Sequence, residues 1–218
     1  MKVKHIFFDL DGTLLDSKQG IIGSLNYMFE KIGDGKKPEQ ELMKFVGPPL
    51  SDSLSKYYGY TEEKNIRARK IFEEDFLVNG IFNATPFEGV IALLQELRQM
   101  DVKVFVATMK PDREANICLN GQHMLEMFDG IAGADLFKGG ANRKELVIRK
   151  ILDRDHIDPQ TAMMVGDRGS DIYAANYLGM VSVAAFYGYG ERKELEEQNP
   201  KYGAESVQAL RDIILKLV

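Results

Sequence analysis

Hydrophobic and polar positions follow two different patterns along the chain. Residues 3–9 form a short apolar run that predicts a buried strand. Between residues 16 and 82 the apolar positions recur at helical spacing, as Ile21, Leu25 and Met28 do, with no alternation typical of a strand. This stretch predicts an all-helical unit, with a first helix capped at Ser17. Further helices are expected over residues 38–47, 49–59 and 61–80, each of which ends at a glycine.

From about residue 86 onward, helical patterns alternate with short apolar strands. Helices are expected over 86–100, 111–121, 141–155, 169–179 and 205–218, and strands over 102–108, 128–134, 161–167 and 181–186. Such alternation predicts an α/β fold, a mostly parallel sheet with helices on both faces. The helical unit therefore interrupts an α/β domain. We expect a core domain of residues 1–15 and 83–218 and an inserted domain of residues 16–82, with hinges near 15–17 and 82–86.

Composition excludes several classes of function. The chain of 218 residues has a hydrophobic fraction of 44%, a charged fraction of 28% and a net charge of −5, which argues against a nucleic-acid or membrane-surface binder. The N-terminal apolar run is too short for a signal peptide, and no stretch is long enough to span a bilayer. Cys118 is the only cysteine, so an internal disulfide is impossible. These features predict a cytoplasmic protein, either a monomer or a homodimer.

Polar residues gather where the predicted strands end. Ligands of parallel α/β sheets bind at this edge, so we expect the polar side chains to meet there. Lys144 lies three residues before the apolar Val147 and should face the sheet. The residues expected at the edge are Asp9, Asp11, Thr108, Lys110, Lys144, Asp167 and Asp171.

This set of side chains fits the chemistry of a phosphate ester. Asp9 and Asp11 are two positions apart on an extended chain and point to the same side. Carboxylates without nearby histidine or cysteine form a hard oxygen site that suits Mg²⁺, and the ion would compensate their mutual repulsion. One carboxylate can then attack phosphorus, and the other can act as acid and base. Gly12 permits the tight turn between this strand and the next segment.

Four motifs in this order resemble those of the haloacid dehalogenase superfamily: "DLDGT" at 9–13, "ATMK" at 107–110, Lys144 and "GDRGSD" at 166–171. The resemblance covers nearly the whole chain. The helical insert, "VGPPLSDSL" at 46–54 and "FYGYG" at 186–190 resemble the phosphoglycolate-phosphatase-like branch, which includes relatives assigned as 5′-nucleotidases. The family fold is a Rossmann-like sheet under a mobile cap, so the resemblance implies that residues 16–82 form a helical cap domain.

The resemblance also implies roles for individual residues. Asp9 would be the nucleophile, Asp11 the general acid and base, and Lys144 a contact to both nucleophile and phosphate. The phosphate would be bound by Thr108 with Gly12, Met109 and Lys110, although Lys110 could instead merely begin a helix. The ligands of Mg²⁺ would be Asp9, Asp167, the main-chain carbonyl of Asp11 and, in the outer shell, Asp171. Gly47, Pro48 and Pro49 would form a substrate loop of the cap, or else only a rigid link between helices.

The expected function is a Mg²⁺-dependent phosphomonoesterase that hydrolyses a small phosphorylated metabolite through an aspartyl phosphate. A sugar-phosphate mutase shares every motif. Some relatives use a cap-loop arginine to hold a second phosphate or a carboxylate, and "FVGPPLSDSL" at 45–54 has none. This absence argues against a mutase and leaves phosphoglycolate open as a substrate. A non-enzymatic receiver-type protein also uses a phospho-aspartate, but such domains are shorter and lack a helical insert.

Overall fold

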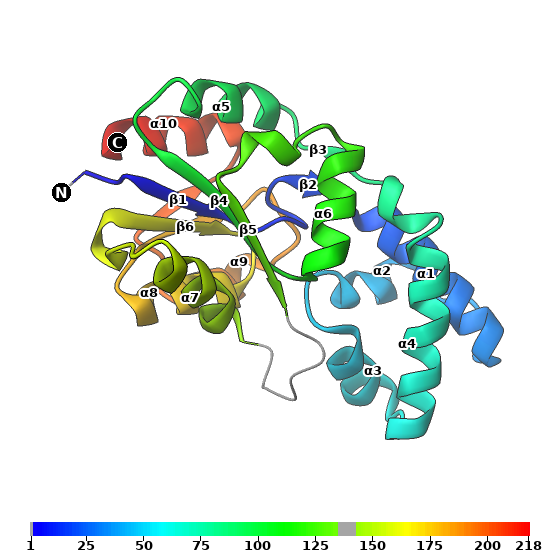
Figure 1. The fold of residues 1–218 in the computed structure, drawn as a ribbon. Coiled ribbons are helices and arrows are strands. Elements are labelled where there is room, and N and C mark those ends of the chain that lie inside the picture. The colour runs from blue at the N-terminus through cyan, green and yellow to red at the C-terminus, as the bar shows by residue number, and fades with distance from the viewer. Residues whose placement is uncertain (1, 135–142) are drawn as a thin grey trace.

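A six-stranded parallel sheet forms the centre of the computed structural model, which describes residues 2–134 and 143–218 (Figure 1). The strand order is β5-β4-β1-β6-β7-β8. Every neighbouring pair is parallel. The strands are β1 (His5–Phe8), β4 (Lys103–Pro111), β5 (Gly130–Ala134), β6 (Ala162–Gly166), β7 (Val181–Ala185) and β8 (Tyr202–Ala204). The predicted fold class is thereby confirmed.

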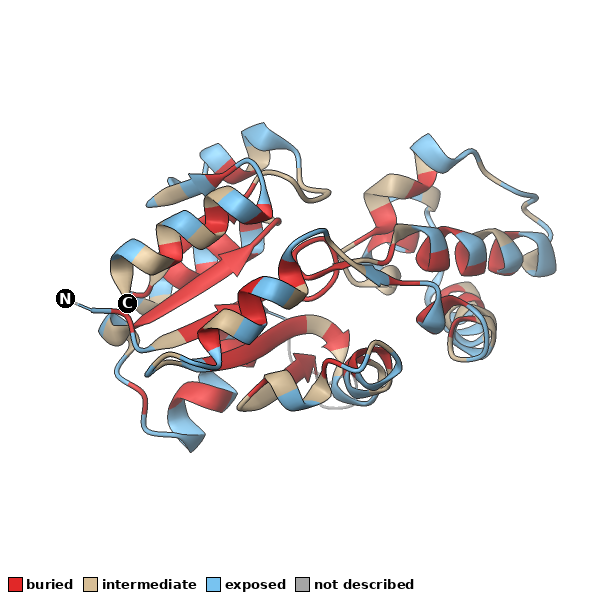
Figure 2. Ribbon diagram, turned by 90° about the horizontal axis from the view of Figure 1, so that it is seen from above, coloured by how far each residue is buried: buried red, intermediate tan, exposed pale blue. Residues whose placement is uncertain are grey.

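Helices cover both faces of this sheet, and alternate side chains of β1 show why. Phe7 packs with buried residues of α7 and α8 on one face. Ile6 and Phe8 point the other way and pack with buried residues of α5, α6 and α10. The strands are buried along most of their length (Figure 2), as expected for parallel strands between two helical layers. These helices are α5 (Val90–Leu97), α6 (Asp112–Gly121), α7 (Lys144–Arg154), α8 (Gly169–Leu178) and α10 (Val207–Leu217).

The segment between residues 17 and 82 lies to one side of the sheet as a group of helices (Figure 1). Its helices are α1 (Lys18–Ile32), α2 (Glu39–Leu42), α3 (Leu50–Tyr58) and α4 (Glu62–Phe76), with the 3-10 turns η1 (Met43–Phe45) and η2 (Gly80–Phe82). A short antiparallel ribbon of β2 (Leu15–Asp16) and β3 (Thr85–Pro86) joins the places where the chain leaves and re-enters the sheet region. The hinges predicted near 15–17 and 82–86 coincide with this ribbon. The division into a core domain and an inserted domain stays a prediction.

Several details differ from the sequence expectations. Helix α4 ends at Phe76 and not at Gly80. The chain turns after Phe76 and brings Gly80 against Gly20 of α1, so closely that a side chain at Gly20 would overlap the carbonyl of Gly80. Strand β4 runs to Pro111, so Lys110 does not begin a helix. The sequence did not predict strand β8 or the short helix α9 (Arg192–Glu196). The remaining described elements are the 3-10 turns η3 (Leu125–Met127) and η4 (Pro159–Thr161). The expected start of α7 at 141–142 lies outside the described residues.

The single cysteine and the hydropathy of the helices can also be compared with the sequence expectations. Cys118 is buried inside α6, where burial raises the pKa of its thiol to about 11. A thiol in that environment is unreactive. Within the described residues, no helix is both long and apolar enough to cross a membrane.

Candidate active site

Three strands deliver the predicted site residues to one edge of the sheet. Asp9 directly follows β1, and its main-chain N–H donates to the carbonyl of Val165 on β6 at 2.9 Å. Asp167 directly follows β6. Thr108 lies in the last part of β4, which pairs with β1 on the other side. The central position of β1 therefore places Asp9 between the other two.

The turn after β1 requires a glycine at its tightest point. Gly12 adopts a φ of +87°, a left-handed conformation that residues with a side chain rarely take. A Cβ atom at this position would lie 2.2 Å from Oδ2 of Asp167. Gly12 thus allows the turn to pack directly on Asp167, while Leu10 is fully buried behind it.

Asp9, Asp167 and Asp171 form a buried carboxylate cluster at this edge. One oxygen of each lies within 4.8 Å of the others. The ammonium of Lys144, from the first turn of α7, lies 2.6 Å from Oδ1 of Asp9 and 2.8 Å from Oδ1 of Asp171. The first contact is a hydrogen bond and the second is an ion pair. The other oxygen of Asp171 accepts from the main-chain N–H of Arg168 at 3.0 Å, so Asp171 both caps α8 and contacts Lys144.

Burial dominates the electrostatics of this cluster. It raises the pKa of Asp9 to about 6, although the neighbouring Lys144 acts in the opposite direction. It raises the pKa of Asp167 to about 8, with a further contribution from the charges of Asp9 and Asp171. Burial alone would lower the pKa of Lys144, but the carboxylates of Asp171 and Asp9 outweigh it and raise that pKa. The positive charge of Lys144 therefore does not fully compensate the burial of the carboxylates of Asp9 and Asp167.

Asp11 belongs to a different ion pair. Its Oδ2 lies 2.9 Å from Nζ of Lys110, and both side chains are almost fully buried. Its Oδ1 is buried and has no hydrogen-bond partner among the described residues. Asp11 and Lys110 line the cavity beside the cluster, so the carboxyl of Asp11 faces the space a substrate would occupy.

The hydroxyl of Thr108 is oriented to donate a hydrogen bond. Its Oγ1 accepts from the main-chain N–H of Lys110 at 3.1 Å, and this leaves its own proton free for an acceptor. Thr108, Met109 and Lys110 line the same cavity as Asp9 and Lys144. A phosphoryl group placed there would meet a hydroxyl and two ammonium groups.

Two hydrogen bonds to Asp167 come from residues that had no role in the sequence prediction. The hydroxyl of Thr13 donates to Oδ1 and the main-chain N–H of Tyr189 donates to Oδ2, each at 2.9 Å. Gly188 packs so closely that a Cβ there would lie 2.3 Å from Cβ of Asp167. The "DLDGT" and "FYGYG" motifs contain these residues, so their place in the motifs was the available signal.

The tyrosine side chain also connects the site to the start of the helical segment. The Tyr189 hydroxyl donates to Oδ1 of Asp16 at 2.6 Å and accepts from the main-chain N–H of Ser17 at 2.8 Å and of Lys18 at 3.2 Å. The hydroxyl of Ser17 itself caps no helix and has no partner among the described residues. The same residue thus orients Asp167 through its backbone and fixes the β2 ribbon through its side chain.

The loop of Gly47, Pro48 and Pro49 lies across the cavity from the sheet edge. Arg168, which follows Asp167, donates from Nη1 to the carbonyl of Val46 at 3.3 Å. Its Nη2 lies 3.2 Å from Oε2 of Glu194. Arg168 is therefore a half-buried contact between the two parts of the chain and not a free surface charge.

The chemistry of this site fits Mg²⁺. When all three carboxylates are ionised, they and the ammonium of Lys144 carry a net charge of two negative units, which the two positive charges of a magnesium ion would balance. All of the clustered side chains offer oxygen, the ligand that Mg²⁺ prefers. From the residues that the structure describes, each oxygen of Asp167 accepts one hydrogen bond and keeps a lone pair for an ion. Asp9, Asp167 and Asp171 are thus suitable side-chain ligands, directly or through water.

Comparisons with known proteins agree with this geometry. A family model described as haloacid dehalogenase-like hydrolase matches residues 6–185. The chain is 30% identical to a 5′-nucleotidase of Pseudomonas aeruginosa over 98% of this chain and 96% of the relative. It is 27% identical to a phosphoglycolate phosphatase of Vibrio vulnificus over 98% of this chain and 97% of the relative. A crystal structure of a predicted phosphatase from Clostridium acetobutylicum superimposes with a TM-score of 0.93 at 34% identity, over 100% of both chains.

Proposed function

The chain belongs to the haloacid dehalogenase-like hydrolase family, and on this premise we propose that it is a Mg²⁺-dependent phosphomonoesterase acting on a small phosphorylated metabolite. The observation that carries the proposal is the contact of Lys144 with Asp9 beside Asp167 and Asp171. The printed names of the two relatives, a 5′-nucleotidase and a phosphoglycolate phosphatase, support the same reaction class.

Asp9 is the proposed nucleophile. Lys144 holds its Oδ1 at 2.6 Å, so the second oxygen is left to attack phosphorus. The new bond joins this oxygen to phosphorus, and the bond between phosphorus and the leaving oxygen breaks. Thr108 and Lys110 donate to the phosphoryl oxygens and stabilise the negative charge in the transition state.

Asp11 is the proposed acid and base. Its carboxyl protonates the leaving oxygen, and it later removes a proton from a water molecule that attacks the aspartyl phosphate. The bond between phosphorus and Asp9 then breaks, which releases inorganic phosphate and restores the carboxylate. The contact with Lys110 keeps the Asp11 side chain beside the cavity.

Mg²⁺ would be held by Asp9, Asp167, the main-chain carbonyl of Asp11 and, in the outer shell, Asp171. When bound, it supplies positive charge that offsets the carboxylates and the phosphoryl group. Residues 16–82 would act as the cap, with the loop of Gly47, Pro48 and Pro49 covering the reacting groups and excluding bulk water.

The test is hydrolysis of p-nitrophenyl phosphate with and without Mg²⁺. The wild-type protein should require the ion, and Asp9→Asn should be inactive, while the exposed control Asp101→Asn should retain full activity. Activity that persists in Asp9→Asn would exclude the proposed nucleophile. Phosphate release without a phosphorylated acceptor distinguishes this function from that of a mutase.

A further inference from the structure

A second cavity, of about 190 Å³, adjoins the first on the side of the helical segment. The two share Asp11, Lys110, Met109 and the loop of Gly47, Pro48 and Pro49. Because Asp11 stands at their junction, an ester whose phosphate lies beside Lys144 would extend its leaving group into the second cavity. This space is therefore where the alcohol part of such an ester would lie.

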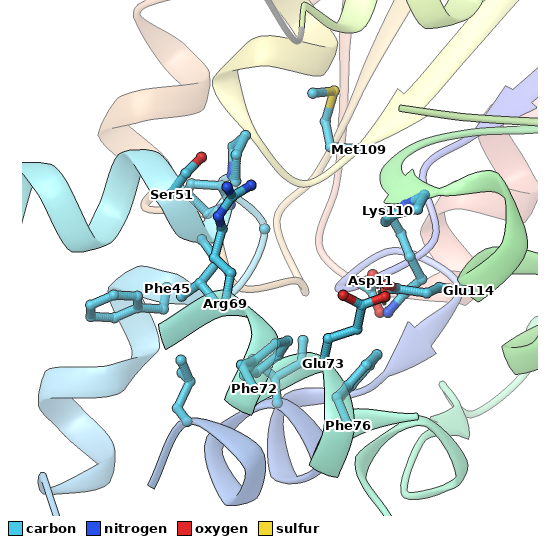
Figure 3. A pocket seen from close by; sticks show the side chains of 17 residues that line it. Asp11, Phe45, Ser51, Arg69, Phe72, Glu73, Phe76, Met109, Lys110 and Glu114 are labelled. Carbon is cyan, nitrogen blue, oxygen red and sulfur yellow. Dashed lines mark ion pairs between the residues drawn. The ribbon is translucent and has the colours of Figure 1, made fainter. Parts of the chain in front are cut away.

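One face of α4 forms the far wall of this second cavity. Arg69, Phe72, Glu73 and Phe76 all line it, with the i, i+3, i+4, i+7 spacing of a single helical face (Figure 3). Asn65 lies one turn earlier and donates from Nδ2 to the carbonyl of Ser51 at 2.8 Å, which fixes α4 against α3. Arg69 is half-buried and Glu73 is exposed, so both charged side chains border open space on this face of α4. They are therefore accessible to a ligand in the cavity.

Arg69 has an unused hydrogen-bond donor in this cavity. Its Nε is buried and has no hydrogen-bond partner in the part of the chain that the structure describes. Across residues 2–134 and 143–218, no carboxylate lies within 4.0 Å of its guanidinium, although Arg168 and Arg211 both form such pairs. A buried donor without a partner is destabilising unless a ligand supplies an acceptor.

The other charged side chains of the second cavity disfavour a leaving group that is itself an anion. Lys110, the other cation of this cavity, is already paired with Asp11. Glu73 and Glu114 bring two further carboxyl groups to the side of the cavity next to Asp11 (Figure 3). A carboxylate on the leaving group would face these acidic side chains, whereas sugar hydroxyls could donate to them. Phe72 and Phe76, with ring centroids 5.2 Å apart, add an aromatic surface.

We propose that Arg69, Phe72 and Glu73 make this enzyme selective for an uncharged, ring-bearing leaving group with hydrogen-bond acceptors, such as a nucleoside, over a short anionic one such as glycolate. The inference rests on the proposed phosphatase function. The aromatic side chains contact the ring, the guanidinium of Arg69 donates to an acceptor on it, and the carboxylates accept from its hydroxyls. The substrate class is then the nucleoside 5′-monophosphates.

The first test compares kcat/KM of the wild-type protein for the four common nucleoside 5′-monophosphates and for phosphoglycolate. At least one nucleotide should exceed phosphoglycolate by roughly tenfold or more, the effect of one good hydrogen bond to a charged group. A preference for phosphoglycolate would overturn the proposal. Acetyl phosphate serves as a reference, because its small leaving group does not extend to Arg69.

The second test replaces the arginine by a side chain of similar length. Arg69→Met should lower kcat/KM for the best nucleotide by roughly 10- to 100-fold and lower acetyl phosphate hydrolysis much less. The matched control Arg67→Met, on the exposed face of the same helix, should leave both activities unchanged. Equal loss with both substrates, or no loss with either, would contradict a role for Arg69 in specificity.

Binding separates failure of this inference from failure of the proposed function. If the wild-type protein hydrolyses no phosphate ester, the phosphatase proposal fails. Calorimetric titration of the full chain with adenosine, cytidine, guanosine and uridine 5′-monophosphates then still tests the second cavity. Binding of any of them that weakens in Arg69→Met and not in Arg67→Met supports it, and absence of binding, or binding that is equal in the two variants, overturns it.

Discussion

The ammonium of Lys144 lies 2.6 Å from Oδ1 of Asp9, although 135 positions separate the two residues in the chain. Both side chains are almost fully buried, and the same ammonium lies 2.8 Å from Asp171. One positive charge therefore serves two buried carboxylates. This arrangement makes Lys144 important for the stability of the fold as well as for the proposed reaction.

Replacement of Lys144 by methionine should destabilise the metal-free protein. The variant leaves Asp9 and Asp171 without their cationic partner, and breaking a buried ion pair in this way costs about 3–5 kcal/mol. Urea unfolding in the presence of a chelator measures the loss. The control Arg149→Met, on the exposed side of α7, should unfold like the wild type. Equal stability of Lys144→Met and wild type would show that the observed ion pairs are not maintained in solution.

Replacement of Asp11 by asparagine should separate catalysis from metal binding. The side chain pairs with Lys110 and lies outside the carboxylate cluster, so Mg²⁺ affinity should be unchanged. Turnover should fall by roughly 10²–10⁴, the usual contribution of a general acid or base. Steady-state kinetics and calorimetric Mg²⁺ titration test the two statements separately. A large loss of Mg²⁺ affinity would mean that the Asp11 side chain is itself a ligand.

Replacement of Thr13 by valine should weaken Mg²⁺ binding. The valine has nearly the same shape but cannot donate to Oδ1 of Asp167. Loss of such a supporting hydrogen bond typically lowers metal affinity by roughly 10-fold or more. Thr13→Ser keeps the hydroxyl and should bind Mg²⁺ almost as the wild type does. If Thr13→Val and Thr13→Ser bind the ion equally well, the hydrogen bond does not orient the ligand.

The metal-free protein should become less stable as the pH rises from about 4 to about 8. The pKa of Asp9 is about 6 and that of Asp167 is about 8 in the folded state, both above the ordinary value of 3.8. The folded state therefore binds more protons than the unfolded state in this range, and the free energy of unfolding falls with pH. Mg²⁺ competes with the same protons, so its affinity should increase over the upper part of the range.

Urea unfolding with a chelator and Mg²⁺ titration at several pH values check these trends. Asp167→Asn removes the group with the higher pKa and should flatten the decline of stability between about pH 6 and 8. A free energy of unfolding that rises with pH over this range in the metal-free wild-type protein would contradict the burial of uncompensated carboxylates.

The sequence predicted the parallel sheet and the sheet edge where the candidate residues meet, because both depend on local patterns. Strand β1 and the residues after it could be located by apolar periodicity, and the edge where Asp9 and Asp167 meet follows from parallel strand geometry. Strand β8 could not be predicted, since it has only three residues and carries no alternation. Its pairing with β7 depends on the tertiary structure and not on its local sequence.

Contacts between segments that are far apart in the chain could not be predicted from the sequence either. The periodicity of α4 shows that Arg69 and Phe72 share a face, but not that this face borders a cavity next to Asp11. The Tyr189 hydroxyl meets the N–H of Ser17 across 172 positions, which no local pattern encodes. The contact of Arg168 with the carbonyl of Val46 joins residues 122 positions apart, and no sequence pattern indicates it.

Detection of a phosphorylated Asp9 is the decisive measurement for the proposed reaction. The wild-type protein is mixed with p-nitrophenyl phosphate and Mg²⁺, quenched in acid within milliseconds, digested and analysed by mass spectrometry. The proposed aspartyl phosphate predicts one added phosphoryl group on the peptide that contains Asp9, and none on that peptide in Asp9→Asn. Steady hydrolysis with no phosphorylated peptide at any quench time, or with the phosphoryl group on another residue, would contradict it.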